Sequence, residues 1–155
     1  MTRVTGTINI ENAKIMWRNF SGVGDAYNRE GDRFFHVRID DPELAEQLLS
    51  DGWNVKTIEP KEEGDQPTHH MKVAIKYGSI PPKIYMITSK NNILLDEDTV
   101  GQLDSADIAN IDLVIRPYNW VTQEGTRNEK RGVKAYVKTM YVTIEEDVFA
   151  SKYGI

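Results

Sequence analysis

The chain has 155 residues, a net charge of −5 and 39% hydrophobic residues, a size and composition typical of one globular domain rather than a disordered chain. It contains no cysteine, which excludes disulfides, thiolate metal sites and cysteine nucleophiles and favours a cytoplasmic location. No stretch approaches the ~18 uncharged apolar residues of a membrane span, and residues 1–14 lack the apolar core of a secretion signal, so we expect a soluble protein.

Most of the chain reads as β-strands. The predicted strands are rich in Val, Ile, Tyr, Phe and Thr and are bounded by Gly, Pro and Asn, as strands usually are. Taken in chain order, they are expected near residues 4–10, 13–20, 33–39, 53–58, 69–77, 83–88, 111–120 and 133–144.

Two helices are predicted between these strands. The first covers 42–52, because Pro42 suits a first helical turn, three leucines form one stripe, and Gly52 is a stop signal. The second, with a weaker pattern, covers roughly 97–109 and includes Val100 among its apolar positions.

The order of these elements matches that of an OB-fold, a five-stranded barrel with a helix between its third and fourth strands. An inserted helix and strand, at about 42–60, would decorate the connection between barrel strands two and three. A β-sandwich would use the same strands and is the alternative. We predict a mainly β, single domain over 1–155, with a short C-terminal tail from about residue 145.

The acidic residues are concentrated in two segments. Residues 40–65 and 96–112 together hold 15 of the 24 acids and 2 of the 19 bases, which leaves 9 acids and 17 bases, a net of +8, for the rest of the chain. An anionic partner meets the local field, so a globally acidic protein can still present a basic surface. We expect the two acidic segments to lie away from that surface.

Four predicted strands divide into an apolar face and a face of cations and rings, because side chains alternate along a strand. A polar outer face is ordinary for one strand. Over four strands, a face of cations and rings without any acidic residue favours nucleic-acid binding, in which phosphates contact the cations and bases stack on the rings. The apolar faces comprise Ala13, Ile15 and Trp17; Phe35, Val37 and Ile39; Met71, Val73, Ile75 and Tyr77; and Val133, Ala135 and Val137. The opposite faces comprise Lys14, Met16, Arg18 and Phe20; Phe34, His36 and Arg38; His70, Lys72, Ala74 and Lys76; and Lys134, Tyr136 and Lys138.

Two predicted loops carry further cations and a ring. Loops 21–32 and 121–132 take the places of the two OB-fold loops that flank an oligonucleotide groove. Polar hairpin tips without function would look similar. The residues that favour binding are Tyr27, Arg29, Arg127, Lys130 and Arg131.

No metal site, cofactor or catalytic group is predicted. His69 and His70 are adjacent in a strand and therefore point to opposite faces, so they cannot chelate one metal ion. The acidic run 96–107 lacks the spacing of a calcium-binding loop, and there is no phosphate-binding glycine motif. We therefore expect no enzymatic activity.

Several segments carry a resemblance to a known family: IENAKIMWRNFSG, YNREGDRFFHVRIDDPELAEQLLSDGWNVK, IPPKIYMITSKN, DLVIRPYNW and GVKAYVKTMYVTIEED. Together, from about residue 8 to 147, they resemble a group of small OB-fold proteins of tailed phages described as single-stranded DNA-binding proteins. The resemblance implies a protein that coats single strands during phage replication or recombination, in the host cytoplasm. One departure concerns the acidic tail by which such proteins often recruit replication partners, because here the acids at 145–147 are followed by VFASKYGI, of mixed charge.

The sequence thus predicts a non-catalytic OB-fold domain that binds single-stranded DNA. RNA binding, the oligomeric state (monomer or dimer) and recruitment of replication or recombination proteins stay open. The alternatives are a β-barrel adaptor that binds an acidic protein and a nuclease or other metal-dependent enzyme. The expected phosphate contacts are Lys14, Arg18, Arg38, Lys72, Lys76, Lys134 and Lys138, and the expected stacking rings are Phe20, Tyr27, Phe34 and Tyr136, all of them exposed.

Overall fold

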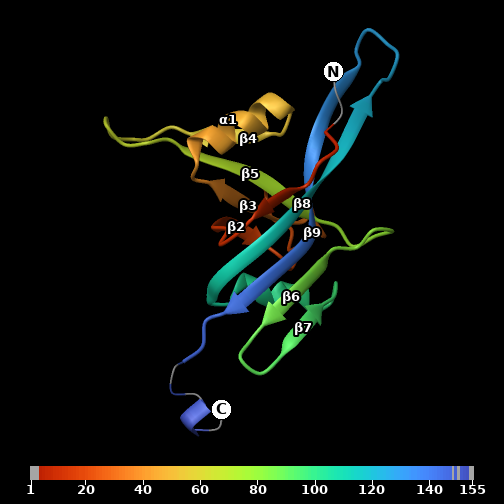
Figure 1. Ribbon diagram of the computed structural model, residues 1–155. Coiled ribbons are helices and arrows are strands. Elements are labelled where there is room, and N and C mark those ends of the chain that lie inside the picture. Colours follow the sequence, from red (N-terminus) through yellow and green to blue (C-terminus); the bar gives the residue numbers. More distant parts are fainter. Residues whose placement is uncertain (1–3, 148, 150, 154–155) are drawn as a thin grey trace.

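The protein is described by a computed structural model over residues 4–147, 149 and 151–153, in which nine strands form a mixed sheet and one α-helix lies beside it (Figure 1). No helix in these residues is long and apolar enough to cross a membrane. The helices are α1 (Pro42–Asp51) and the short 3₁₀ helices η1 (Val100–Asp104) and η2 (Ser151–Tyr153). The strands are β1 (Ile8–Ile10), β2 (Ile15–Asn19), β3 (Arg33–Ile39), β4 (Val55–Ile58), β5 (Thr68–Ile75), β6 (Lys83–Ile87), β7 (Asn92–Leu95), β8 (Ile108–Thr122) and β9 (Lys130–Ile144).

Six strands are hydrogen-bonded in the order β1–β8–β9–β5–β3–β2, while β4 pairs with β5, and β6 pairs with both β9 and β7. The long strand β9 is antiparallel to β8 on one edge and parallel to β5 and then β6 on the other. The two ends of this order, β1 and β2, are consecutive in the chain. Between them, Ala13 N donates to Ile111 O (2.7 Å), and Lys14 O accepts from Arg38 N (2.8 Å), so this segment is bonded to both β8 and β3.

The first predicted helix is confirmed as α1. The Asp41 carboxylate accepts a hydrogen bond from Glu43 N (3.0 Å), and Pro42 follows it in the first turn, where no N–H is required. The helix ends at Gly52, whose φ of 104° lies in the left-handed region that glycine adopts without strain.

The second predicted helix, over 97–109, is wrong. The chain forms only η1 there, and β8 begins at Ile108. The Arg18 guanidinium donates to the carbonyl oxygens of Leu103 (2.8 Å) and Ala106 (2.9 Å). These carbonyls are therefore satisfied by a side chain rather than by the N–H groups of a further helical turn.

The eight predicted strands all have a counterpart, with shifted ends. The chief difference is the last hairpin, where β8 and β9 are longer than predicted, so the turn covers 123–129 instead of 121–132. The short strand β7 was not predicted, because its apolar residues, Ile93 to Leu95, are contiguous and show no alternation.

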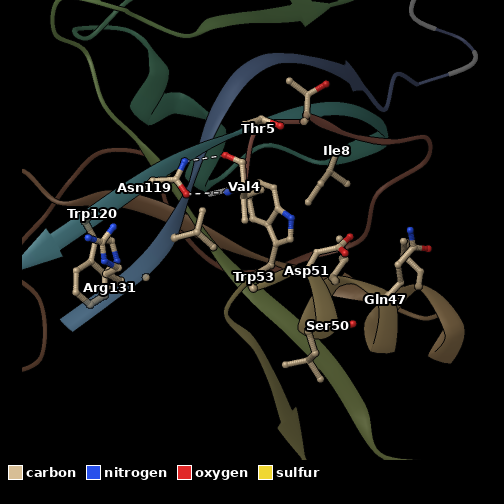
Figure 2. A pocket seen from close by; sticks show the side chains of 18 of the residues that line it. Val4, Thr5, Ile8, Gln47, Ser50, Asp51, Trp53, Asn119, Trp120 and Arg131 are labelled. Atoms are coloured by element: carbon tan, nitrogen blue, oxygen red, sulfur yellow. Dashed lines mark hydrogen bonds between the residues drawn. The ribbon is translucent and has the colours of Figure 1, made fainter. Parts of the chain in front are cut away.

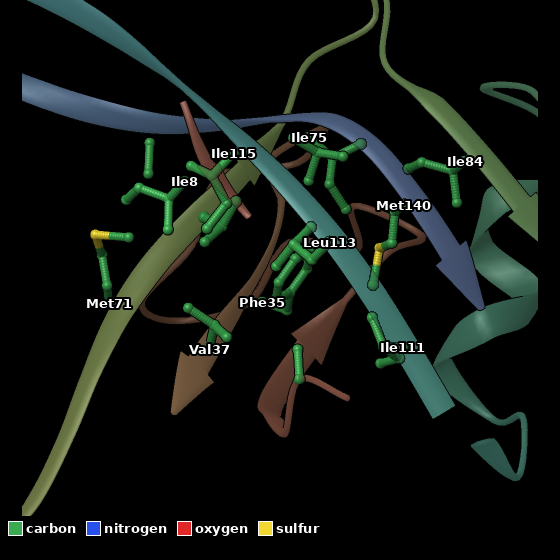
Figure 3. Packing of buried hydrophobic residues seen from close by; sticks show 14 of the residues in the cluster. Ile8, Phe35, Val37, Met71, Ile75, Ile84, Ile111, Leu113, Ile115 and Met140 are labelled. Atoms are coloured by element: carbon green, nitrogen blue, oxygen red, sulfur yellow. The ribbon is translucent and has the colours of Figure 1, made fainter. Parts of the chain in front are cut away.

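One apolar core packs against the inner side of these strands. Figure 3 shows Phe35, Val37, Met71, Leu113 and Met140 together in this cluster, although they come from four different strands. The predicted apolar faces of β3, β5 and β9 are confirmed as core, except that Tyr77 is only partly buried against it. The core residues of these faces are Phe35, Val37, Ile39, Met71, Val73, Ile75, Val133, Ala135 and Val137.

The predicted faces of β2 are wrong beyond Met16, because a β-bulge reverses the alternation. The register with β3 shifts between Met16 and Asn19, and Trp17 has a φ of 53°. Trp17 therefore lies outside the core with 56% of its surface exposed, whereas Phe20 is fully buried and stacks on Phe35 at 5.6 Å between ring centroids. Phe20 is thus a core residue and not an exposed ring.

Candidate nucleic-acid interface

Strands β2, β3, β5, β8 and β9 carry cations and rings on the side opposite the core. Several of these side chains are buried, yet none of them belongs to the apolar core cluster. We call this surface the basic–aromatic face and define it as Trp17, Phe34, His36, Arg38, His70, Lys72, Ala74, Lys76, Arg116, Tyr118, Lys134, Tyr136 and Lys138.

The centre of the face is one row of directly paired residues across four strands. Phe34 of β3 pairs with Ala74 of β5, Ala74 with Tyr136 of β9, and Tyr136 with Arg116 of β8. Ala74 has a small side chain and lies between the larger rings of Phe34 and Tyr136 in this row. The row therefore alternates apolar ring, small residue, ring and cation.

Cations lie over both rings of this row. The Lys72 ammonium nitrogen is 4.5 Å from the centroid of the Phe34 ring. The Arg116 guanidinium carbon and the Lys134 ammonium nitrogen are 4.8 Å and 5.4 Å from that of Tyr136. These distances suit cation–π attraction, which holds the positive groups close to the rings.

The predicted exposure of Phe34 and Tyr136 is wrong, although both lie on the predicted side of the sheet. Only 7% of Phe34 and 6% of Tyr136 are exposed. The long cationic side chains cover the rings, since Lys and Arg lay their apolar stems over neighbouring apolar surface. A base can reach these rings only if the cations move aside.

Trp17 supplies an exposed ring beside this row. Its indole meets the imidazoles of His36 and His70 edge to face, with centroids 4.9 Å and 5.2 Å apart. The bulge in β2 is what turns this large ring out of the core. Trp17 was predicted to be buried, and it is instead one of the most accessible aromatic groups on the face.

His36 and His70 form a hydrogen-bonded pair, with 3.0 Å between their Nδ1 atoms. One Nδ1 donates and the other accepts, so the pair requires at least one neutral imidazole. Burial lowers the pKa of His36 to about 4, helped by the nearby His70 and Lys72. Burial and the charge of Lys56 also lower the pKa of His70.

The histidine pair predicts a loss of stability in mild acid. The unfolded chain binds a proton at His36 below about pH 6.5, whereas the native state resists it down to about pH 4, so the free energy of unfolding falls across that window. Because His36 is partly exposed, we expect about 1–2 kcal/mol from it. Urea unfolding at about pH 7 and pH 4.5 should show a smaller pH effect for His36→Asn. An equal effect in both proteins would contradict this assignment.

The predicted phosphate-binding cations differ in what holds them. Lys72, Lys76, Lys134 and Lys138 are exposed on the face. Three others already have partners. The Lys14 ammonium donates to Asn12 Oδ1 (3.3 Å), the Arg38 guanidinium pairs with Asp40 (3.1 Å), and Arg18 donates to the carbonyl oxygens of Leu103, in η1, and Ala106, just after it. The Arg18 side chain thus has a structural role, because it links β2 to the segment between η1 and β8. The pair with Asp40 also brings one end of the acidic segment 40–65 beside the face, which was not expected.

Between β2 and β3, the long loop is tied by its own side chains. The Glu30 carboxylate accepts from Gly24 N (2.7 Å), and that of Asp25 accepts from Tyr27 N (2.7 Å). Tyr27 is 94% exposed, and the neighbouring Arg29 is exposed as well. The side chains of Tyr27 and Arg29 are therefore exposed on a loop whose backbone is held by internal hydrogen bonds.

At the turn between β8 and β9, Arg131 is held by two acids. Its guanidinium contacts Glu129 at 3.1 Å and Glu124 at 3.9 Å, and its hydrogen bond lowers the pKa of the Glu129 carboxyl. Arg127 and Lys130 are exposed. Arg131 and Lys130 lie in β9 rather than in a loop.

Residues Arg116 and Tyr118 were missed by the sequence analysis. Both lie in a strand that was predicted. They alternate with the core residues Leu113 and Ile115, and this alternation could have assigned them to the face opposite the core. Tyr118 is 49% exposed and its ring lies 5.5 Å from that of Tyr136. Trp17 could not have been found in this way, since the bulge breaks the alternation.

A pocket of about 990 Å³ lies elsewhere, between residues 4–9, α1 and the β8–β9 hairpin (Figure 2). The Asn119 amide closes one side through two hydrogen bonds to the Val4 backbone, at 2.9 Å and 2.7 Å. No residue of the basic–aromatic face lines it. Among the residues described, no three His, Cys, Asp or Glu side chains gather in a way that could hold a metal ion.

Comparisons with known proteins identify a family and a similar fold. A family model described as "Putative phage ssDNA-binding domain" matches residues 2–155. No curated protein is similar enough in sequence to match. The single-stranded DNA-binding protein from bacteriophage Enc34 has a similar structure, with a TM-score of 0.54, 9% identity, and coverage of 100% of this chain and 97% of that chain.

Two further solved structures are similar. The C-terminal truncation of the Enc34 protein has a TM-score of 0.54 and 11% identity, covering 95% of this chain and 94% of that chain. The crystal structure of gp2.5, a single-stranded DNA-binding protein encoded by bacteriophage T7, has a TM-score of 0.43 and 9% identity, with 96% and 95% covered. The Enc34 structures show that the fold resembles that of phage single-stranded DNA-binding proteins, which are OB-fold proteins.

Proposed function

The chain belongs to the phage ssDNA-binding domain family, and from this we propose that it coats single-stranded DNA, without catalysing a reaction, through its basic–aromatic face. The observation that carries the proposal is the row Phe34–Ala74–Tyr136–Arg116 with Lys72 and Lys134 over its rings. Proteins that bind single strands combine cations that follow the backbone with rings on which bases stack.

We propose different tasks for the two kinds of ring. The exposed rings contact bases directly. Phe34 and Tyr136 instead hold the covering cations by cation–π contact until a bound DNA strand displaces those cations. Exposed lysines and arginines, together with the partly exposed Arg116, contact the phosphates. The proposed base contacts are Trp17, Tyr27 and Tyr118, and the proposed phosphate contacts are Arg29, Lys72, Lys76, Arg116, Arg127, Lys130, Lys134 and Lys138.

We also propose that the sheet closes as an OB-type barrel. The strand order, the parallel pair β5–β9 and the bonds from residues 13 and 14 to both β8 and β3 support this. In place of a helix between the third and fourth barrel strands, the chain would have the β6–β7 hairpin and η1. The β2–β3 loop and the β8–β9 turn would then flank the face, as in other OB-folds.

We further propose a role in phage replication or recombination, together with partner proteins from those processes; membership of the family supports this proposal. A gel shift with single-stranded and duplex oligonucleotides of one sequence, at two salt concentrations, tests the proposal. We expect preferential binding of the single strand, weakened by salt. Binding of an acidic protein without oligonucleotide binding would instead support an adaptor, and cleavage of labelled DNA with Mg²⁺ would identify a nuclease.

Salt dependence measures the phosphate contacts. Each contact on a single strand contributes a slope of about −0.7 to log affinity against log salt. We expect Lys134→Ala/Lys138→Ala to flatten the slope by roughly 1 to 1.5. The matched control is Lys61→Ala/Lys90→Ala, which removes two exposed lysines outside the face. An unchanged slope in the first variant, or equal flattening in both, would contradict the assignment.

A further inference from the structure

A second pair of rings lies further along β9, outside the basic–aromatic face. Tyr141 of β9 pairs directly with Tyr85 of the parallel strand β6. Their rings are stacked, with centroids 5.4 Å apart and planes 8° apart, and 42% of Tyr141 is exposed. Both tyrosines alternate with buried residues, Ile84 and Met140, and so point away from the core. The stacked pair therefore lies on the surface of the sheet, with Tyr141 exposed and Tyr85 partly exposed.

This pair is continuous with the basic–aromatic face. Tyr136 and Tyr141 are five positions apart on one strand, about 16 Å at the usual rise per residue. Between them, β9 carries the exposed Lys138, and Lys83 of β6 pairs with Thr139 and is exposed as well. A strand that leaves Tyr136 along β9 therefore passes two cations before it meets the tyrosines.

One acid lies close to the pair and is engaged elsewhere. Asp112 of β8 is the cross-strand neighbour of Tyr141. Its carboxylate accepts a hydrogen bond from Asn12 N at 3.1 Å, in the turn before β2. The hydrogen bond holds the Asp112 carboxylate at the β1–β2 turn. Because β8 and β6 pair with opposite edges of β9, this carboxylate and Lys83 lie on opposite sides of Tyr141.

We propose that Tyr85 and Tyr141, with Lys83 and Lys138, form a second subsite for the sugar–phosphate backbone of a bound single strand. The inference rests on the proposed function and extends it. Because the two rings already stack on each other, they leave no room for a base between them, and their contribution is the phenol hydroxyls and ring edges. Tyrosine hydroxyls and lysines are common partners of backbone phosphates. The subsite lengthens the strand that one copy of the protein covers.

Oligonucleotide length separates the two subsites. The binding site of one OB-fold spans about 4–16 nucleotides, so an oligothymidine of about 6 nucleotides fills the basic–aromatic face and one of about 20 reaches the second subsite. We expect Lys83→Ala/Tyr141→Ala to weaken binding of the long oligonucleotide about tenfold and to leave that of the short one unchanged. Tyr141→Phe should reproduce a part of this loss, because it removes only the hydroxyl.

The matched control is Lys90→Ala/Tyr153→Ala, which removes one exposed lysine and one exposed tyrosine elsewhere and should bind both lengths like the wild type. Thermal unfolding checks that each variant is folded; where the double variant is not, Lys83→Ala alone, at an exposed position, gives the same comparison. Equal weakening of both lengths, or no weakening of the long one, overturns the second subsite only. Failure of the wild-type protein to bind either oligonucleotide overturns the proposed function as well.

Discussion

Phe20→Ala is expected to lower the free energy of unfolding by about 3–5 kcal/mol, the usual loss when a buried aromatic ring is truncated. Phe20 is fully buried and stacks on Phe35 in the core. The backbone around it is also fixed, since the Asp104 carboxylate accepts from Phe20 N (2.6 Å) and Ser21 N (3.0 Å). The core therefore cannot easily close over the cavity. Urea unfolding of variant and wild type measures the difference.

The control for this experiment is DNA affinity. Below the unfolding transition, the folded Phe20→Ala protein should bind single-stranded DNA as the wild type does, because the ring lies on the core side of the bulge. A variant that keeps its stability and loses affinity would place Phe20 on the binding surface, as the alternation in the sequence had predicted.

Trp17→Ala is expected to do the opposite and weaken single-strand binding by about 1–3 kcal/mol, the contribution of one stacked base. The indole is the largest exposed ring beside the central row, and its edge contacts with His36 and His70 fix its orientation. Stability should change by less than about 1 kcal/mol, since more than half of the side chain is already in water. Fluorescence titration with an unstructured oligonucleotide and urea unfolding measure the two effects.

Trp120→Ala is a suitable matched variant, because Trp120 is also a partly exposed tryptophan and lies over Gly132 at the pocket rather than on the face. It should leave affinity for a short oligonucleotide unchanged. If only Trp120→Ala loses affinity, the base contact lies toward the β8–β9 hairpin and not at Trp17. If both tryptophan variants lose affinity equally, the binding surface is not confined to the face and extends to that hairpin.

The sequence by itself determined the strand-rich fold, α1, and which residues of β3, β5 and β9 enter the core. Each depends on local signals: Pro42 and Gly52 bound the helix, and strict alternation, as in Phe35 and Val37, separates the two faces of a strand. The same alternation placed Lys72, Lys134 and Tyr136 on one side of the sheet, and the structure agrees with that placement.

The tertiary structure decided what depends on neighbours distant in the sequence. One extra residue in the β2 bulge exchanges Trp17 and Phe20 between surface and core, and only pairing with β3 reveals it. Whether a ring on the outer side is exposed depends on which cations lie over it, as Arg116 does over Tyr136. Likewise, the Leu103 carbonyl in η1 accepts a hydrogen bond from Arg18, 85 residues away, a contact that the local pattern over 97–109 does not contain. Alternation in a sequence assigns a side of the sheet, whereas exposure and partners are set by contacts between strands that the chain brings together only on folding.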